Sequence, residues 1–447
     1  MFALGAPAVA AASITVQPSL VSRLATTTQP PTQAQCVAAF TVPCYEPSQL
    51  ETAYNEQPLF SDGIDGKGQT IVIVDSFGSP TIQSDLATFD AQFGLPAPPS
   101  FTIIQPAGQV PAWDPSNSAM LDWAGETTLD VEWSHSIAPD AKILLVETPV
   151  AETEGVAGFP QIVTAENYVV NHNLGDVISQ SFAATEETFP TTESLLALRS
   201  AYLNAYAHDV TVLGAAGDTG ATDYSNVAGT EYYTHPVVAW PASDPLVTGV
   251  GGTQLSLNAS GQRTAPDQVW NDTYNTSLQE VFFGDAGPTP LAGSGGKSVV
   301  FSRPSYQNSV ASVVGNQRGV PDIAMSAACS GLVDTYQSFP GEAAGWYVSC
   351  GTSEATPLFA GIVALADQVA HHKLGLINPA LYELKAEHAP GLVPVTIGNN
   401  TVSFTQNGKE YTVQGFDATR QYNLATGVGT VNAALFVPEL AAVAGRQ

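Results

Sequence analysis

Five short apolar runs, separated by helix-like stretches, constrain the fold of this 447-residue chain more than any other feature of its sequence. Between two of them, residues 193–208 place Leu195, Leu198, Tyr202 and Ala205 at helical spacing. Strands that are apolar throughout, rather than alternately, are typical of a parallel sheet covered by helices on both faces. The pattern therefore predicts an α/β fold, a single large domain built on a mostly parallel sheet. The runs are TIVIVD (70–75), KILLV (142–146), DVISQS (176–181), VTVLGAA (210–216) and LVTGV (246–250).

The charge balance excludes two classes of partner. The chain has 41 acidic residues against 13 Lys and Arg, a formal net charge of −28. Nucleic acids and anionic membrane surfaces both need clustered bases, so neither is expected to bind. An acidic surface suits low pH, because carboxylates lose their charge, and their mutual repulsion, near pH 4. Solubility or adaptation to salt explains the composition equally well, and both remain open.

The beginning of the chain reads as an export signal followed by an arm. Residues 1–13 (MFALGAPAVAAAS) are apolar and end in small residues, although they lack a basic start. Residues 14–45 are rich in Thr, Gln and Pro, which is typical of a linker or an extended arm. We therefore expect residues 1–44 to precede one folded domain, residues 45–447. No later run is long and apolar enough to predict a transmembrane helix.

Four cysteines point to the same compartment. Cys36, Cys44, Cys329 and Cys350 form no CxxC motif, so neither a zinc ribbon nor a thioredoxin-like site is indicated. Two local disulfides, Cys36–Cys44 and Cys329–Cys350, are the natural pairing in an exported protein, and the other two connectivities remain open. The chain is therefore expected to be secreted or extracytoplasmic.

The first candidate for chemistry is Ser353, in the segment Gly351-Thr352-Ser353 before a long apolar stretch. A glycine turn would place this serine in the first turn of a helix, where the helix dipole and free N–H groups favour negative charge. That setting suits a nucleophile whose reaction develops an oxyanion. A serine at such a position is more often an ordinary helix cap, and the motif alone does not separate the two.

A base for this serine is found among carboxylates rather than histidines. None of the seven histidines lies in a glycine-rich HGT-type turn, and neither HExxH nor GxSxG occurs. In GETTLDVEWSHSIAP (125–139), Glu126 and Asp130 are four residues apart and share one helix face. If buried, such a pair shares one proton and can accept another from a hydroxyl in acid. A solvated acidic helix edge is the alternative.

A third acid follows the strand pattern at 210–216. In GAAGDTGATD (214–223), Asp218 is expected in a tight turn at the carboxyl end of a parallel strand, the edge where ligands bind. In acid it can carry a proton and donate a hydrogen bond to an oxyanion. An ordinary turn aspartate beside glycine is the competing interpretation.

Together, and in this order, GETTLD, GAAGDTG and CGTSEATP resemble the three active-site segments of the sedolisins, serine-carboxyl peptidases related in fold to subtilisin. The resemblance covers nearly the whole chain after residue 44, including GKGQTIVIVD (66–75), WPASDPLVTGVGGT (240–253) and RGVPDIA (318–324). It implies a subtilisin-like fold and an acid-acting peptidase that hydrolyses protein or peptide substrates; separately, we expect a monomer. It assigns Ser353 as nucleophile, Glu126 as general base, Asp130 as its holder and Asp218 as oxyanion stabiliser. Asp75, outside that triad, is interpreted as structural.

The chain departs from the family pattern in two respects. Sedolisins bind calcium near the C-terminus through two aspartates, but the matching positions here are Pro394 and Asn423. Because calcium prefers carboxylates, we expect weak or absent binding, with Asp417 as a conceivable substitute ligand. The family also has a large N-terminal prosegment, whereas residues 1–44 precede the matching region here. These departures motivate an alternative, a catalytically silent exported binding protein on the same fold; an esterase is favoured least.

Overall fold

The computed structural model describes the whole chain except residues 1–20, 24–27, 153–156, 227–228, 285–286 and 446–447. A central sheet of eight strands runs through it, with strand order β11-β10-β8-β6-β3-β5-β4 and β14 beside β10. All neighbouring pairs are parallel except β10 and β11. The strands are β3 (Thr70–Ser76), β4 (Phe101–Ile104), β5 (Lys142–Thr148), β6 (Val177–Gln180), β8 (Thr211–Ala215), β10 (Thr248–Gln254), β11 (Gln268–Val269) and β14 (Ile323–Ser326).

The five apolar runs form the strands β3, β5, β6, β8 and β10, and strand β3 shows why they are apolar throughout. Ile71 and Ile73 pack into the core on one face of the sheet. Val72 and Val74 pack into a second core on the other face. All four side chains are fully buried, and each such burial stabilises the fold by about 1.5–3 kcal/mol. The predicted α/β fold with a mostly parallel sheet is confirmed.

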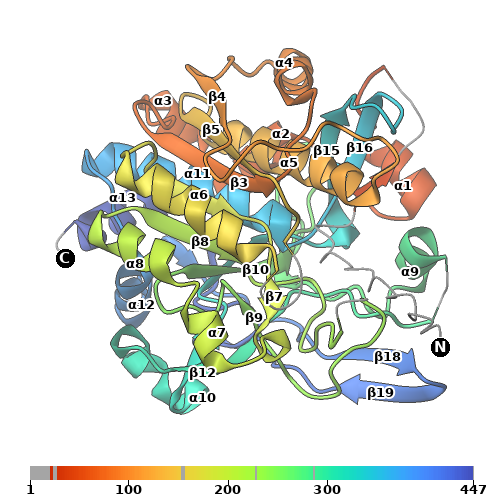
Figure 1. The fold of residues 1–447 in the computed structure, drawn as a ribbon, viewed down its shortest axis with the longest axis vertical. Coiled ribbons are helices and arrows are strands. Elements are labelled where there is room, and N and C mark those ends of the chain that lie inside the picture. Colours follow the sequence, from red (N-terminus) through yellow and green to blue (C-terminus); the bar gives the residue numbers. More distant parts are fainter. Residues whose placement is uncertain (1–20, 24–27, 153–156, 227–228, 285–286, 446–447) are drawn as a thin grey trace, which may run out of the picture.

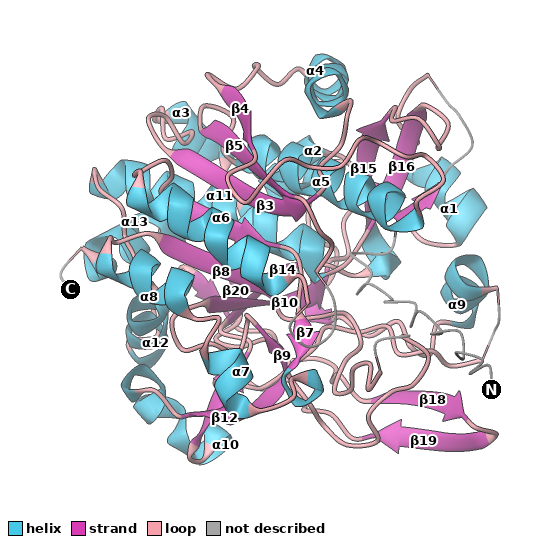
Figure 2. Cartoon of the chain, in the orientation of Figure 1, coloured by secondary structure: helices cyan, strands magenta, loops and turns pink. Residues whose placement is uncertain are grey.

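Helices cover both faces of the sheet (Figures 1 and 2). Helices α5 (Ser118–Ile137) and α11 (Thr352–Ala370) pack against each other and against β3 on one face, and α13 (Ala433–Ala444) lies against α11. Helices α6 (Phe159–Asn171) and α8 (Ser200–Ala207) pack on the opposite face. The two longest helices, α5 and α11, therefore share the side of the sheet on which the candidate residues lie.

Residues 193–208 do not form the single helix that their spacing indicates. Helix α7 (Thr192–Leu196) ends early, and α8 begins at Ser200. Just before α8, Arg199 donates to both carboxylate oxygens of buried Asp244, at 2.5 and 2.8 Å. This ion pair anchors the turn between the two helices.

The segment expected as an extended arm contains a helix, α1 (Gln33–Phe40). Its first turn is closed by a capping box, in which the Thr32 side chain accepts from the Gln35 N–H and Gln35 accepts from Thr32 in return. A disulfide between Cys36 and Cys44 then ties the helix to β2 (Cys44–Tyr45). The expectation of an extended arm was therefore wrong for this part. The signal-like residues 1–13 lie outside the described residues.

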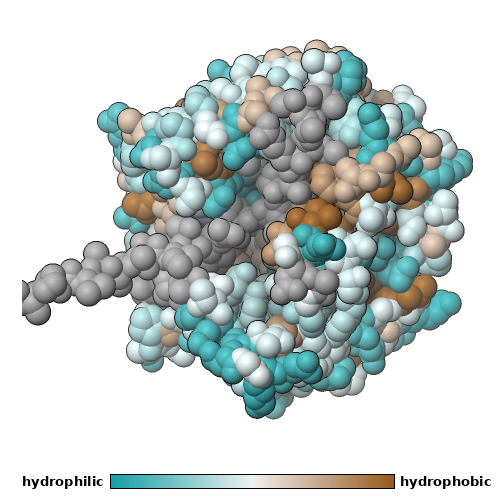
Figure 3. Space-filling model, turned by 90° about the vertical axis from the view of Figure 1, so that its right-hand side faces the viewer, coloured by the Kyte–Doolittle hydropathy of each residue, from teal (hydrophilic) through white to brown (hydrophobic). Residues whose placement is uncertain are grey.

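The second disulfide joins Cys329 to Cys350, so the predicted local pairing is confirmed. On the face drawn in Figure 3, polar residues prevail and the hydrophobic ones form small separate patches. Within the described part of the chain, every helix is too short or too polar to cross a bilayer.

Candidate active site

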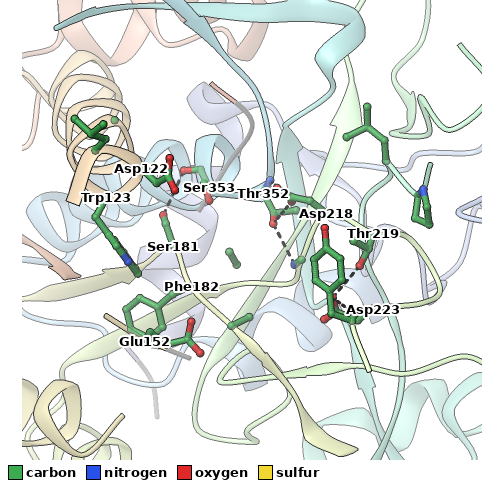
Figure 4. A pocket seen from close by; sticks show the side chains of 18 of the residues that line it. Asp122, Trp123, Glu152, Ser181, Phe182, Asp218, Thr219, Asp223, Thr352 and Ser353 are labelled. Carbon is green, nitrogen blue, oxygen red and sulfur yellow. Dashed lines mark hydrogen bonds between the residues drawn. The ribbon is translucent and has the colours of Figure 1, made fainter. Parts of the chain in front are cut away.

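A cavity of about 380 Å³ opens at the carboxyl ends of the central strands (Figure 4). Its walls include the first two turns of α5, the first turn of α11 and the segments that follow β6 and β8. Ser353 and Asp218 both line it, with Thr352 between them. Two candidate residues that are far apart in the sequence therefore meet at the sheet edge where ligands of parallel α/β proteins bind.

The turn that carries Ser353 is held on both sides. Gly351 caps α11 with φ 128°, a left-handed conformation that suits glycine, and its N–H donates to the backbone oxygen of Ala327 at 2.7 Å. The preceding Cys350 is bonded to Cys329. Ser353 is only 4% exposed, yet it faces the cavity. Its hydroxyl therefore lies at the N-terminus of a 19-residue helix, in the favourable end of the helix dipole.

Glu126 and Asp130 are fully buried on α5, which excludes the alternative of a solvated helix edge. They do not line the cavity themselves but lie behind residues that do. Ser181, at the end of β6, joins the two regions: its hydroxyl donates to Oδ1 of Asp130 at 2.8 Å and lies 3.4 Å from the backbone oxygen of Ser353. Burial first, and then the charges of Asp75 and Glu126, raise the pKa of Asp130 well above its usual range.

Asp75 is a third carboxyl in this buried group. It occupies the end of β3 and is fully buried. Burial, followed by the negative charge of Glu126, raises the pKa of Asp75 well above its ordinary value. The sequence-based interpretation treated Asp75 as structural and missed this coupling. Its position at the carboxyl end of a central strand was the available signal.

Asp218 follows β8 and is hydrogen-bonded to the first turn of α11, the helix that carries Ser353. Its Oδ1 accepts from both the backbone N–H and the hydroxyl of Thr352, each at 2.7 Å. Burial raises the pKa of Asp218 to about 6, even though the hydrogen bonds from Thr352 act in the opposite direction. This carboxyl therefore carries a proton in moderately acid solution, where it can donate a hydrogen bond into the cavity.

Most of the cavity wall was not identified from the sequence. The strand pattern DVISQS ends on Ser181, but nothing in that pattern separated this serine from its neighbours. The other overlooked residues that line the cavity include Asp122, Trp123, Glu152, Phe182, Asp223, Tyr224, Phe339 and Tyr347.

The two positions that match the family's calcium ligands carry no carboxylate. Pro394 offers no side-chain oxygen, and Oδ1 of Asn423 already accepts from the N–H groups of Ala425 and Thr426, at 3.0 and 2.9 Å. The ammonium of Lys385 donates to two backbone oxygens of the same loop, those of Arg420 and Val428, at 3.0 and 2.8 Å. The backbone of Asp417 pairs with that of Asn399 in an isolated bridge, which does not engage the Asp417 carboxylate.

Metal ligands are also scarce elsewhere in the described residues. The cluster with suitable spacing is Cys36, Cys44 and Asp334, and its two cysteines form the disulfide. The sulfurs are therefore oxidised and unsuited to hold a metal ion.

The fold and the site together define a protein of the subtilisin-like type. The family model described as the subtilase family matches residues 107–387, and the chain belongs to that family. Within it, the chain is 32% identical to kumamolisin from Bacillus sp. (strain MN-32) over 80% of its length, and 28% identical to sedolisin from Pseudomonas sp. (strain 101) over 90%. It is 27% identical to human tripeptidyl-peptidase 1 over 69%. The resemblance to sedolisins is therefore confirmed.

A solved structure supports the same conclusion. Pseudomonas sedolisin, a serine-carboxyl proteinase complexed with two molecules of pseudo-iodotyrostatin, matches with a TM-score of 0.71 and 25% identity. The match covers 89% of this chain and 97% of that one. By contrast, the chain spans only 58% of kumamolisin, 62% of sedolisin and 50% of tripeptidyl-peptidase 1.

Proposed function

We propose that the protein is an acid-acting serine-type peptidase that cleaves peptide bonds through Ser353, Glu126 and Asp130. The observation that carries the proposal is a group of buried carboxyls, in which burial and the charges of Asp75 and Glu126 raise the pKa of Asp130, behind a helix-borne serine on a cavity wall, with Asp218 on the same wall. Membership of the subtilase family and similarity to several named peptidases support it.

The reaction proceeds through an acyl-enzyme. Ser353 Oγ bonds to the substrate's carbonyl carbon while Glu126 takes the hydroxyl proton, and Asp130 stabilises the protonated pair. The carbonyl oxygen becomes an oxyanion that accepts a hydrogen bond from protonated Asp218. The C–N bond then breaks as Glu126 returns the proton to the leaving amine. A water molecule repeats the sequence, losing its proton to Glu126, and the acid product leaves with Ser353 restored.

At low pH a carboxylate is a better general base than histidine. Below its pKa of roughly 6.5, histidine is protonated and cannot accept a proton. A pair of carboxyls that shares one proton retains an acceptor there, while Asp218 keeps its proton below about pH 6. The carboxyl pair, as proton acceptor, and Asp218, as hydrogen-bond donor, are therefore both expected to work best in acid solution.

The two disulfides also bear on where the protein acts. Two disulfides suit an exported protein, and we propose a secreted or extracytoplasmic peptidase that acts as a monomer on proteins or peptides. Calcium is not part of the proposal, because Pro394 offers no carboxylate and the side-chain oxygen of Asn423 already accepts from two backbone N–H groups.

The test is peptide cleavage between pH 2 and pH 8 by the wild type and by Ser353→Ala. We expect a rate maximum in acid and loss of cleavage in the variant, with unchanged circular dichroism. Labelling of Ser353 by a peptide aldehyde at low pH would exclude the silent binding protein. Full activity in the variant rejects the nucleophile, whereas an inactive wild type that resists labelling favours the binding protein.

A further inference from the structure

Ser181 connects the acid group with the nucleophile's helix. It follows β6 directly, is 2% exposed and lines the cavity beside Ser353 (Figure 4). The hydroxyl lies 2.8 Å from Oδ1 of Asp130 and 3.4 Å from the backbone oxygen of Ser353. A serine hydroxyl has one hydrogen, and the shorter contact is the one that receives it.

This hydrogen bond makes the two oxygens of Asp130 unequal. Oδ1 accepts from Ser181, so a proton on the carboxyl is favoured on the other oxygen. Oδ2 is buried and has no hydrogen-bond partner among the described residues. When Asp130 carries the proton of the proposed acid pair, Oδ2 is therefore the oxygen left to hold it.

We propose that Ser181 is a positioning residue: its hydroxyl binds Oδ1 of Asp130, stabilises the ionised form of that carboxyl and thereby keeps the acid pair able to accept the proton of Ser353 in more acid solution. The inference rests on the proposed function and deepens it. Without the hydroxyl, Asp130 would hold a proton more strongly, and the pair would become fully protonated, and so unable to accept the proton of Ser353, at a higher pH.

The charges around Asp130 and the hydrogen bond from Ser181 act in opposite directions on the protonation of this carboxyl. Asp75 from β3 and Glu126 from the same helix are the charged groups that act on it, and both favour its protonated form. The hydroxyl of Ser181 opposes them, because a hydrogen bond to a carboxylate stabilises the ionised form. Removing that hydroxyl should therefore make the pair hold its proton to a higher pH.

The test compares Ser181→Ala with Ser179→Ala, a matched control two residues earlier. Ser179 is fully buried on the same strand, and its hydroxyl has no hydrogen-bond partner among the described residues. We expect Ser181→Ala to lower kcat about tenfold with little change in KM, as for the loss of one buried hydrogen bond to a carboxyl group. The acid limb of the pH profile of kcat/KM should shift to higher pH, by about half to one pH unit. Ser179→Ala should do neither.

A second variant protects the test against a folding defect. Ser181→Cys keeps a side chain of similar size but replaces the hydroxyl with a weak donor, so the same shift is expected. If both variants keep the acid limb of the wild type, the proposal is wrong, even if their rates fall.

A titration separates this proposal from the proposed function. Carbon-13 NMR of the labelled carboxyl groups, measured in the Ser353→Ala background, reads the protonation of Asp130 without turnover. A higher pKa in Ser181→Ala supports the positioning role even in a chain that cleaves nothing. An unchanged titration overturns it even in an active peptidase.

Discussion

Glu166 provides the sharpest test of how burial and pH interact in this fold. It lies on α6, is 1% exposed and has no hydrogen-bond partner for either oxygen among the described residues. Burial alone raises the pKa of Glu166 to about 8, from an ordinary value of 4.5. The neighbouring Tyr202 donates its hydroxyl to Gln180 instead, so it does not compensate the carboxyl. The substitution that tests this is Glu166→Gln, which keeps the shape of the side chain and removes its titratable carboxyl group.

The magnitude follows from the pKa in the two states. Below pH 4.5 both states hold the proton, and the full stability is present. Between pH 4.5 and about 8 the unfolded chain is ionised while the folded protein still holds the proton. Stability therefore falls by about 1.36 kcal/mol per pH unit, or about 5 kcal/mol in total across that window. Domains are stable by only about 5–15 kcal/mol, so this is a large fraction.

Urea unfolding at pH 4 and pH 8 measures the effect. The free energies of unfolding of wild type and Glu166→Gln should be nearly equal at pH 4, whereas the variant should be more stable by about 5 kcal/mol at pH 8. Glu280→Gln, at an exposed position on α9 (Thr276–Phe283), controls for the loss of a surface charge. A difference between wild type and Glu166→Gln that is the same at both pH values would refute the reasoning.

Three further predictions concern the site and its support. Glu126→Gln should lower kcat by about 10²–10⁴, the usual contribution of a general base, and a loss below tenfold in steady-state cleavage would contradict its role. Asp218→Asn has a donor at every pH, so the decline of kcat/KM above about pH 6 should disappear, and a pH profile that keeps this decline would show that Asp218 does not cause it. Lys385→Met removes an ammonium that binds two backbone oxygens, so it should lower the free energy of unfolding by about 1–3 kcal/mol. EDTA should leave the Tm of the wild type unchanged, and a Tm that falls in EDTA would reveal a calcium site.

The strands and the start of the helix that carries Ser353 were predictable because their signals are local. Ile71 to Val74 are apolar in unbroken succession, which a sheet buried on both faces requires, and the glycine before Thr352 and Ser353 marks a helix start. The break between α7 and α8 was not predictable, because it is anchored by an ion pair between Arg199 and Asp244, which lies 45 residues along the chain.

The interactions among the charged groups of the site could not be predicted either, because they also join residues that are far apart in the sequence. Asp75 and Asp130 are 55 residues apart, and only the packing of α5 on β3 brings their charges together. Ser181 differs from Ser179 by a contact with Asp130 that no local pattern encodes. Helix α1 was missed because a Thr-, Gln- and Pro-rich composition suggested an arm, whereas a capping box and a disulfide stabilise the helix.

The acidity of this chain has a buried component that solubility or adaptation to salt does not explain, since both need charges in contact with water. Six further carboxyls are buried away from water, and burial is the largest cause that raises the pKa of each well above its ordinary value or, for Glu166, to about 8: Glu56, Glu132, Glu166, Asp334, Glu354 and Asp367. Burial disfavours the ionised form of each, so each makes the fold less stable as the pH rises above its unfolded pKa. The acid pair behind Ser353 depends on protons for the same reason. Low pH therefore favours the fold and the proposed chemistry through one physical cause, the protonation of buried carboxyl groups.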